Sequence, residues 1–220
     1  MSEQYEVVKK NKIRQLRDKA NYDVAAVHAV LDAALTASVG FVDDGNAIVV
    51  PMIYGRVGET LYLHGARKAR IIRLLEQNVE ACVNVTLIDG IVFARSAFNS
   101  SMNYRSATVY GTPTLVDDYD DKVEAMRIIS EHTMPGRWAE LREPLSREVK
   151  MTGVIALEIT HGSAKIASGP PDDEDDDYAI PIWAGVLPVE STRTQIITDE
   201  QVLDGVEPSE VVLKLQHQRV

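Results

Sequence analysis

The clearest chemistry in the sequence lies in a short basic segment, Gly-Ala-Arg-Lys at positions 65–68, with Arg70 two residues further on. Gly65 lets the backbone make a close turn, and three cationic side chains follow it within five residues. Charge-assisted donors beside backbone N–H groups suit a phosphate or another compact anion. The segment therefore predicts an anion-binding turn, and spacing alone leaves a solvent-exposed basic face as the alternative.

The elements around this segment read as strand, turn, strand and helix. Residues 47–54 and 60–63 are rich in Val, Ile and Tyr, and the turn residues 55–58 between them predict a β-hairpin. Apolar residues then recur at helical spacing from about Arg67 to Asn78, which places the cations in the first helical turn. Cations are disfavoured at that end of a helix, whereas a bound anion there meets free N–H groups.

The remaining pattern predicts a mainly β chain with peripheral helices. Asp23 is the expected cap of a helix over 24–35. Helical spacing returns at 117–132 and, interrupted by a proline, at 138–150. Asp89-Gly90 between two β-rich runs predicts a further hairpin, and Gly111-Thr112-Pro113 predicts a bend in a long strand. The further β-rich runs are 36–42, 81–88, 91–98, 104–116, 154–159 and 164–167. This order favours a small antiparallel barrel over a parallel α/β sheet.

Four separated runs resemble one known family. They are Leu-Tyr-Leu-His-Gly-Ala-Arg-Lys-Ala-Arg at 61–70, the segment 89–106, Pro-Gly-Arg-Trp at 135–138, and Gly-Pro-Pro at 169–171 with Trp-Ala-Gly-Val at 183–186. In this order they resemble the pyridoxamine 5'-phosphate oxidase-like FMN-binding split-barrel superfamily, in its branch of flavin-nucleotide-binding proteins related to nitroimidazole resistance proteins. The chain departs from that branch at Asn99 and Ser100, where His is frequent, and at Lys68, where Ser is frequent.

The resemblance implies an antiparallel split β-barrel of about six strands with peripheral helices, an FMN cofactor and a homodimer with FMN at its interface. It implies that Arg67 and Lys68 bind the FMN phosphate and that the strand before Gly55 lies along the isoalloxazine ring. It assigns no catalytic residue and no metal site. The residues that it implies for the cofactor are Pro51, Met52, Ile53, Tyr54, His64, Gly65, Ala66, Arg67, Lys68, Tyr104, Arg105 and Ser106.

The resemblance favours a redox enzyme acting on a small molecule, because a bound flavin supplies the electron transfer. A haem-binding or haem-degrading split-barrel protein and a flavin-binding protein without catalysis are the alternatives. A deazaflavin site is disfavoured by the lack of an extra basic groove. Oxidation of pyridoxamine 5'-phosphate itself is disfavoured as well, because the C-terminal Arg and His segment of that oxidase is not recognisable. For Arg105 the alternative role is a surface ion pair with an acidic residue.

Composition excludes several other classes. The net charge of −10 disfavours a nucleic-acid partner, since phosphate backbones are bound mainly by Lys and Arg. No run approaches the ~18 apolar residues of a membrane helix, and the first residues lack a signal-peptide core, so a cytoplasmic protein is expected. Cys82 is expected to be an inert thiol in a strand. Rossmann, Walker, hydrolase and zinc motifs are absent from the sequence.

The predicted organisation is a single domain over 21–188, preceded by a loosely held arm over 1–20 and followed by a polar extension over 189–220. Within that extension, the amphipathic run 211–215 is a candidate for packing on the domain. The acidic run 172–177 is expected to be a solvated loop rather than a calcium site, because the spacing of an EF-hand loop is absent.

Overall fold

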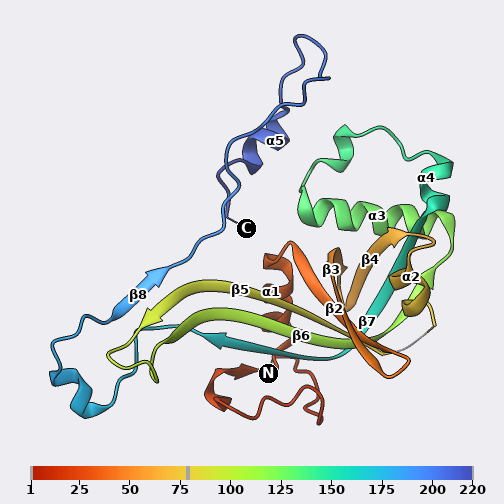
Figure 1. Cartoon of the computed structure of the whole chain (residues 1–220). Coiled ribbons are helices and arrows are strands. Elements are labelled where there is room, and N and C mark those ends of the chain that lie inside the picture. Colours follow the sequence, from red (N-terminus) through yellow and green to blue (C-terminus); the bar gives the residue numbers. More distant parts are fainter. Residues whose placement is uncertain (1, 78–79, 220) are drawn as a thin grey trace. The chain divides into compact units, whose positions relative to one another are not determined.

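The computed structural model describes residues 2–77 and 80–219, which form two compact units (Figure 1). Of the described residues, unit 1 contains 2–51, 80–111 and 159–190, and unit 2 contains 52–77, 112–158 and 191–219.

Unit 1 contains an antiparallel sheet whose central strand is β5 (Ala81–Phe93). β5 pairs with β2 (Thr36–Asp43), with β6 (Ser101–Val116) and with β8 (Gly185–Pro188), and these strands lie side by side in Figure 1. The end of β7 (Thr152–Ala167) pairs with the short β1 (Ala20–Asn21).

Alternation along these strands separates a buried face from an open face. The side chains of Val39, Val83 and Val109 are fully buried. Their neighbours on the opposite face lie in two rows across β2, β5 and β6. In the first row the paired residues are Ser38, Asn84 and Thr108, and in the second row they are Gly40, Cys82 and Tyr110.

The helix of unit 1, α1 (Val24–Ala33), places Val27 and Leu31 in the core. Its predicted cap is confirmed, because the Asp23 carboxylate accepts a hydrogen bond from the Ala25 N–H at 3.0 Å. The sequence placed the end of this helix two residues too late. Unit 1 also contains two short 3-10 helices, Arg17–Lys19 and Asp175–Ala179.

The N-terminal residues are attached more firmly than the prediction of a loose arm allowed. Tyr5 is buried, and its hydroxyl lies 3.1 Å from His28 Nε2. The Asn11 side chain is also buried and donates to the Gly162 carbonyl at 3.0 Å. These contacts bind the segment before α1 to the sheet.

Unit 2 contains the C-terminal part of β3 (Asn46–Val57), then β4 (Thr60–Ala66) and the first half of β7. β3 and β4 form the predicted hairpin, and β4 pairs along its whole length with β7. Its helices are α2 (Arg70–Leu75), α3 (Tyr119–Thr133), the 3-10 helix Trp138–Glu140, α4 (Ser146–Met151) and α5 (Glu210–Leu215). Gly55 brings β3 against α3, because a Cβ there would lie 2.7 Å from the Ile128 carbonyl oxygen.

Several predicted boundaries are wrong. Asp89-Gly90 is not a hairpin turn, because β5 continues through both residues with a register shift. The runs 154–159 and 164–167 belong to one strand, β7. The long strand predicted over 104–116 is confirmed as β6. The predicted Pro-interrupted helical piece over 138–150 is found as two short helices on either side of Pro144.

The helix after the basic segment also differs from its prediction. α2 starts at Arg70, so Arg67 and Lys68 lie in a turn before it rather than in its first turn. The predicted end of this helix near residue 78 lies outside the described residues. The helix predicted from residue 117 is confirmed as α3, whose cap Asp118 accepts hydrogen bonds from two backbone N–H groups.

Within the described ranges 2–77 and 80–219, the model contains no helix that combines the length and the apolarity needed to cross a bilayer.

Candidate functional site

The basic turn begins where β4 ends, and the ladder with β7 continues into it. Gly65 lies opposite Gly153, and the Arg67 N–H donates to the Met151 carbonyl at 2.8 Å. In an antiparallel ladder this alternation directs the Gly65 N–H toward β7 and the Ala66 N–H away from it. Ala66 is therefore the residue of this pair whose N–H is oriented to serve an anion.

Close packing holds the turn in place. A Cβ at Gly153 would lie 2.6 Å from the Ile72 Cγ2 atom and 3.2 Å from the Arg67 Cα atom. Glycine therefore lets the turn and α2 approach β7 closely. Sequence reasoning missed Gly153, because a lone glycine 86 positions from Arg67 gives no local signal.

The two cations of the turn have different surroundings. Arg67 Nη1 lies 2.6 Å from Glu76 Oε2, with both side chains about one third exposed. Lys68 is exposed and has no ion pair among the residues that the structure describes. Lys68 is therefore free to meet an anion, whereas Arg67 would have to exchange Glu76 for it.

His64 precedes the turn and lies opposite Val154 of β7. Its Nδ1 atom is buried and has no hydrogen-bond partner in the described part of the chain. Burial lowers the pKa of His64 below its ordinary value, so the imidazole is neutral at neutral pH. A neutral ring nitrogen without a partner can accept a hydrogen bond from a ligand or coordinate a metal ion.

The residues predicted to lie along a flavin ring divide into two kinds. Met52 and Tyr54 are buried, and the Tyr54 ring lies 4.6 Å from the His132 ring, centroid to centroid. Pro51 and Ile53 are exposed on the same strand. Ile53 and Pro51, rather than the Tyr54 ring, are therefore the side chains that β3 offers to a ligand.

The remaining predicted residues lie on β6 in unit 1 and have partners there. Arg105 makes two hydrogen bonds to the Asp89 carboxylate, at 2.7 and 2.9 Å, which is the alternative role that its sequence left open. The Ser106 hydroxyl lies 3.1 Å from both Asn84 Nδ2 and Thr86 Oγ1. Tyr104 is half-buried opposite Ile88.

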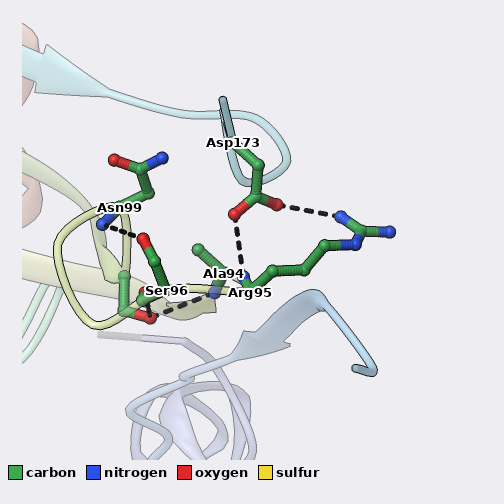
Figure 2. Close-up of polar contacts among 6 residues, drawn as sticks. Ala94, Arg95, Ser96, Asn99 and Asp173 are labelled. Atoms are coloured by element: carbon green, nitrogen blue, oxygen red, sulfur yellow. Dashed lines mark hydrogen bonds and ion pairs between the residues drawn. The ribbon is translucent and has the colours of Figure 1, made fainter. Parts of the chain in front are cut away.

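A buried ion pair joins the loop that follows β5 to the acidic loop around Asp173 (Figure 2). The Asp173 side chain is fully buried. Its carboxylate accepts hydrogen bonds from the Arg95 backbone N–H and from Arg95 Nη1, both at 2.8 Å. The Arg95 guanidinium also lies 5.1 Å from the centre of the Tyr178 ring. The prediction of a solvated acidic loop is thus wrong for Asp173, which anchors that loop.

The loop after Arg95 closes on itself. Ser96 Oγ accepts from the Asn99 N–H at 3.1 Å, and the Ser100 hydroxyl donates to the Ser96 carbonyl at 2.8 Å.

No group of three or more His, Cys, Asp or Glu side chains within residues 2–77 and 80–219 is arranged to hold a metal ion.

Breaking this ion pair is expected to destabilise the protein. Arg95→Met leaves the buried Asp173 carboxylate without its counter-charge, which should cost about 3 kcal/mol of unfolding free energy. The measurement is urea denaturation, with Arg127→Met as control, because Arg127 and Glu124 form an exposed pair whose loss should cost less than about 1 kcal/mol. Equal costs for the two variants would contradict the anchoring role of Asp173.

Comparison with known proteins identifies the family and the similar structures. Residues 23–166 match the family model described as pyridoxamine 5'-phosphate oxidase. The flavocytochrome Anf3 from Azotobacter vinelandii is similar in structure, with a TM-score of 0.90 and 34% sequence identity over 96% of this chain and 98% of that one. A search of curated proteins gave no match.

Two further solved structures are similar. The FAD and heme binding protein from Mycobacterium smegmatis has a TM-score of 0.87 and 35% identity, over 90% of this chain and 98% of that one. A putative 5-nitroimidazole antibiotic resistance protein from Bacteroides thetaiotaomicron has a TM-score of 0.54 and 25% identity, over 67% of this chain and 86% of that one.

Proposed function

The chain belongs to the pyridoxamine 5'-phosphate oxidase family, and we propose that it is a flavin-binding redox protein. The predicted superfamily and the predicted mainly antiparallel β fold with peripheral helices are confirmed. The observation that carries the proposal is the cationic turn after β4, with an exposed Lys68 and an Ala66 N–H directed away from the ladder.

We propose that this turn binds the phosphate next to the ribityl chain of the flavin, a group that FMN and FAD share. Lys68 supplies a mobile positive charge and Ala66 a backbone donor. Arg67 joins them when it exchanges the Glu76 carboxylate for the phosphate. The family resemblance of the sequence implies FMN as the nucleotide, whereas one similar protein is named for FAD binding. Ile53 and Pro51 are the side chains that β3 offers to the ring.

A second candidate function is haem binding, and a specific observation favours it. His64 presents a buried, neutral Nδ1 atom with no partner in the described part of the chain, which suits an iron ligand. Two similar proteins are named as a flavocytochrome and as an FAD and heme binding protein. A haem would extend the proposed redox function by one-electron chemistry.

The absorption spectrum of the purified protein tests both functions. We expect a flavin spectrum after isolation or after addition of FMN or FAD, and mass spectrometry of the released cofactor then identifies the nucleotide. Haem binding predicts a Soret band after addition of haemin, which His64→Ala should weaken. A protein that takes up neither flavin would refute the main proposal, whatever its response to haemin.

The proposed contact with the phosphate is tested by comparing the binding of FMN with that of riboflavin, which lacks the phosphate. Arg67→Ala with Lys68→Ala should weaken FMN binding tenfold or more, since a lost hydrogen bond to a charged group costs about 1.5 to 3 kcal/mol. Riboflavin binding should change little, as calorimetric titration can measure. Lys150→Ala removes an exposed cation of α4 and serves as the control. Equal weakening of both ligands would exclude phosphate recognition by this turn.

We also propose that two copies of the chain form a homodimer with the flavin at their interface. An exposed flavin ring would remain largely wet on one chain, whereas ligand sites bury most of their ligand, and a two-fold partner covers two sites at once. Trp183 is a candidate contact, because it is largely exposed while its ring lies 5.8 Å from the Phe93 ring.

Light scattering on the flavin-loaded protein measures the mass of the assembly and so tests the proposed homodimer. A mass of about twice 24.3 kDa is expected at micromolar concentration. A mass of 24.3 kDa with the flavin still bound would reject the shared site and leave Trp183 as part of a lid within one chain.

A further inference from the structure

We propose that a cavity beside Gly40 in unit 1 is a binding site for a small, uncharged aromatic molecule, in addition to the flavin. Its volume is about 310 Å³. None of the residues assigned to the flavin lines it. The lining residues come from β2, the start of β3, β5 and β6, and they are Gly40, Phe41, Val42, Ala47, Ile48, Val49, Glu80, Ala81, Cys82 and Tyr110.

Gly40 is the residue that leaves this space open. A Cβ at Gly40 would meet its nearest atoms, the Cys82 carbonyl oxygen and the Val49 Cγ2 atom, at 3.6 and 3.9 Å. These are ordinary contacts, and the backbone at Gly40 does not adopt the positive φ that favours glycine. Neither the backbone conformation nor the packing around a Cβ requires glycine here, although glycine weakens a strand. The absence of a side chain at Gly40 leaves this part of the cavity open.

Gly40 contrasts with Gly55, the glycine where β3 meets α3. A Cβ at Gly55 would lie 2.7 Å from a backbone oxygen, so close packing explains that residue. At Gly40 no comparable contact exists among the described residues, and the open cavity takes its place.

The polar groups at the rim determine what kind of molecule fits. The Tyr110 hydroxyl donates to the Lys10 carbonyl at 2.9 Å, and Lys10 Nζ lies 5.4 Å from the centre of the Tyr110 ring. Glu80 forms an ion pair with Lys10. Because these groups have partners within the chain, a charged occupant would lose its hydration without gaining a free counter-charge.

The remaining lining is mainly apolar and includes two aromatic residues, Phe41 and Tyr110. Ala47, Val42 and Val49 contribute aliphatic surface, and Tyr110 contributes an aromatic ring. Aromatic ligands gain from such ring contacts in addition to apolar burial. The volume lies at the low end of the range for ligand pockets, about 300 to 1,000 Å³, which suits a molecule of about two to three rings.

Binding of a neutral fluorophore tests the site. The probe is N-phenyl-1-naphthylamine, whose emission rises in apolar surroundings, and the full-length protein is titrated without added flavin. Saturable binding is expected. Gly40→Val should weaken it at least tenfold, because the added side chain fills the cavity, while the thermal midpoint stays the same or rises. Ser38→Val adds a similar side chain to the same face of β2, outside the cavity lining, and should leave probe binding unchanged.

Three results would overturn the proposal: no saturable binding by the wild-type chain, unchanged binding by Gly40→Val, or displacement of the probe by saturating riboflavin. The last result would make the cavity part of the flavin site. If Gly40→Val does not fold, Ala47→Phe fills the cavity from β3 and is judged by the same criteria. Flavin uptake is measured separately on each variant, so failure of the proposed flavin function leaves this test intact.

Discussion

The antiparallel ladder between β4 and β7 is the constraint on which the candidate phosphate site depends. It runs without interruption from Thr60 to Ala66, and the hydrogen bond from the Arg67 N–H to Met151 extends it into the turn. This continuation fixes which backbone N–H groups are used by the sheet and which point away from it. The direction of the Ala66 N–H and the start of α2 at Arg70 both follow from that register.

The same ladder explains why the helix contributes little to anion binding. α2 has six residues and its cap, Ala69, provides no side-chain hydrogen bond. The helix-dipole argument drawn from the sequence required Arg67 and Lys68 in the first helical turn, but both residues lie in the turn before α2. The phosphate recognition that we propose for this turn therefore depends mainly on side-chain charge.

The sequence predicted features whose causes are local and missed those whose causes are distant. Asp23 was predicted as a cap, because a cap and the N–H groups that it binds are neighbours in sequence. The Asp89-Gly90 signal failed because Gly90 serves a distant contact. A Cβ at Gly90 would lie 3.0 Å from the Val186 side chain of β8, so glycine here admits a neighbouring strand instead of forming a turn.

The candidate site also combines features with local causes and features with distant causes. The Gly-Ala-Arg-Lys segment is contiguous and could be predicted, whereas the partners that control it, Gly153 and Glu76, have no spacing rule that links them to Arg67. The ion pair of Arg95 with Asp173 joins residues 78 positions apart, and composition alone suggested a solvated loop there. Long-range pairing of this kind is decided by the register of strands, which a single sequence specifies only through the whole fold.

Glu76 gives the turn a further property that its cations alone would not have. It holds the Arg67 guanidinium in an ion pair at 2.6 Å before any ligand arrives. It also competes with the ligand, since an arriving phosphate must displace a carboxylate that is itself partly desolvated. A dianionic phosphate carries more charge than the carboxylate and offers more acceptor oxygens, so it can win this exchange, whereas a single carboxylate on a ligand gains nothing over Glu76. The arrangement of Arg67 and Glu76 therefore favours phosphate-bearing ligands over other small anions.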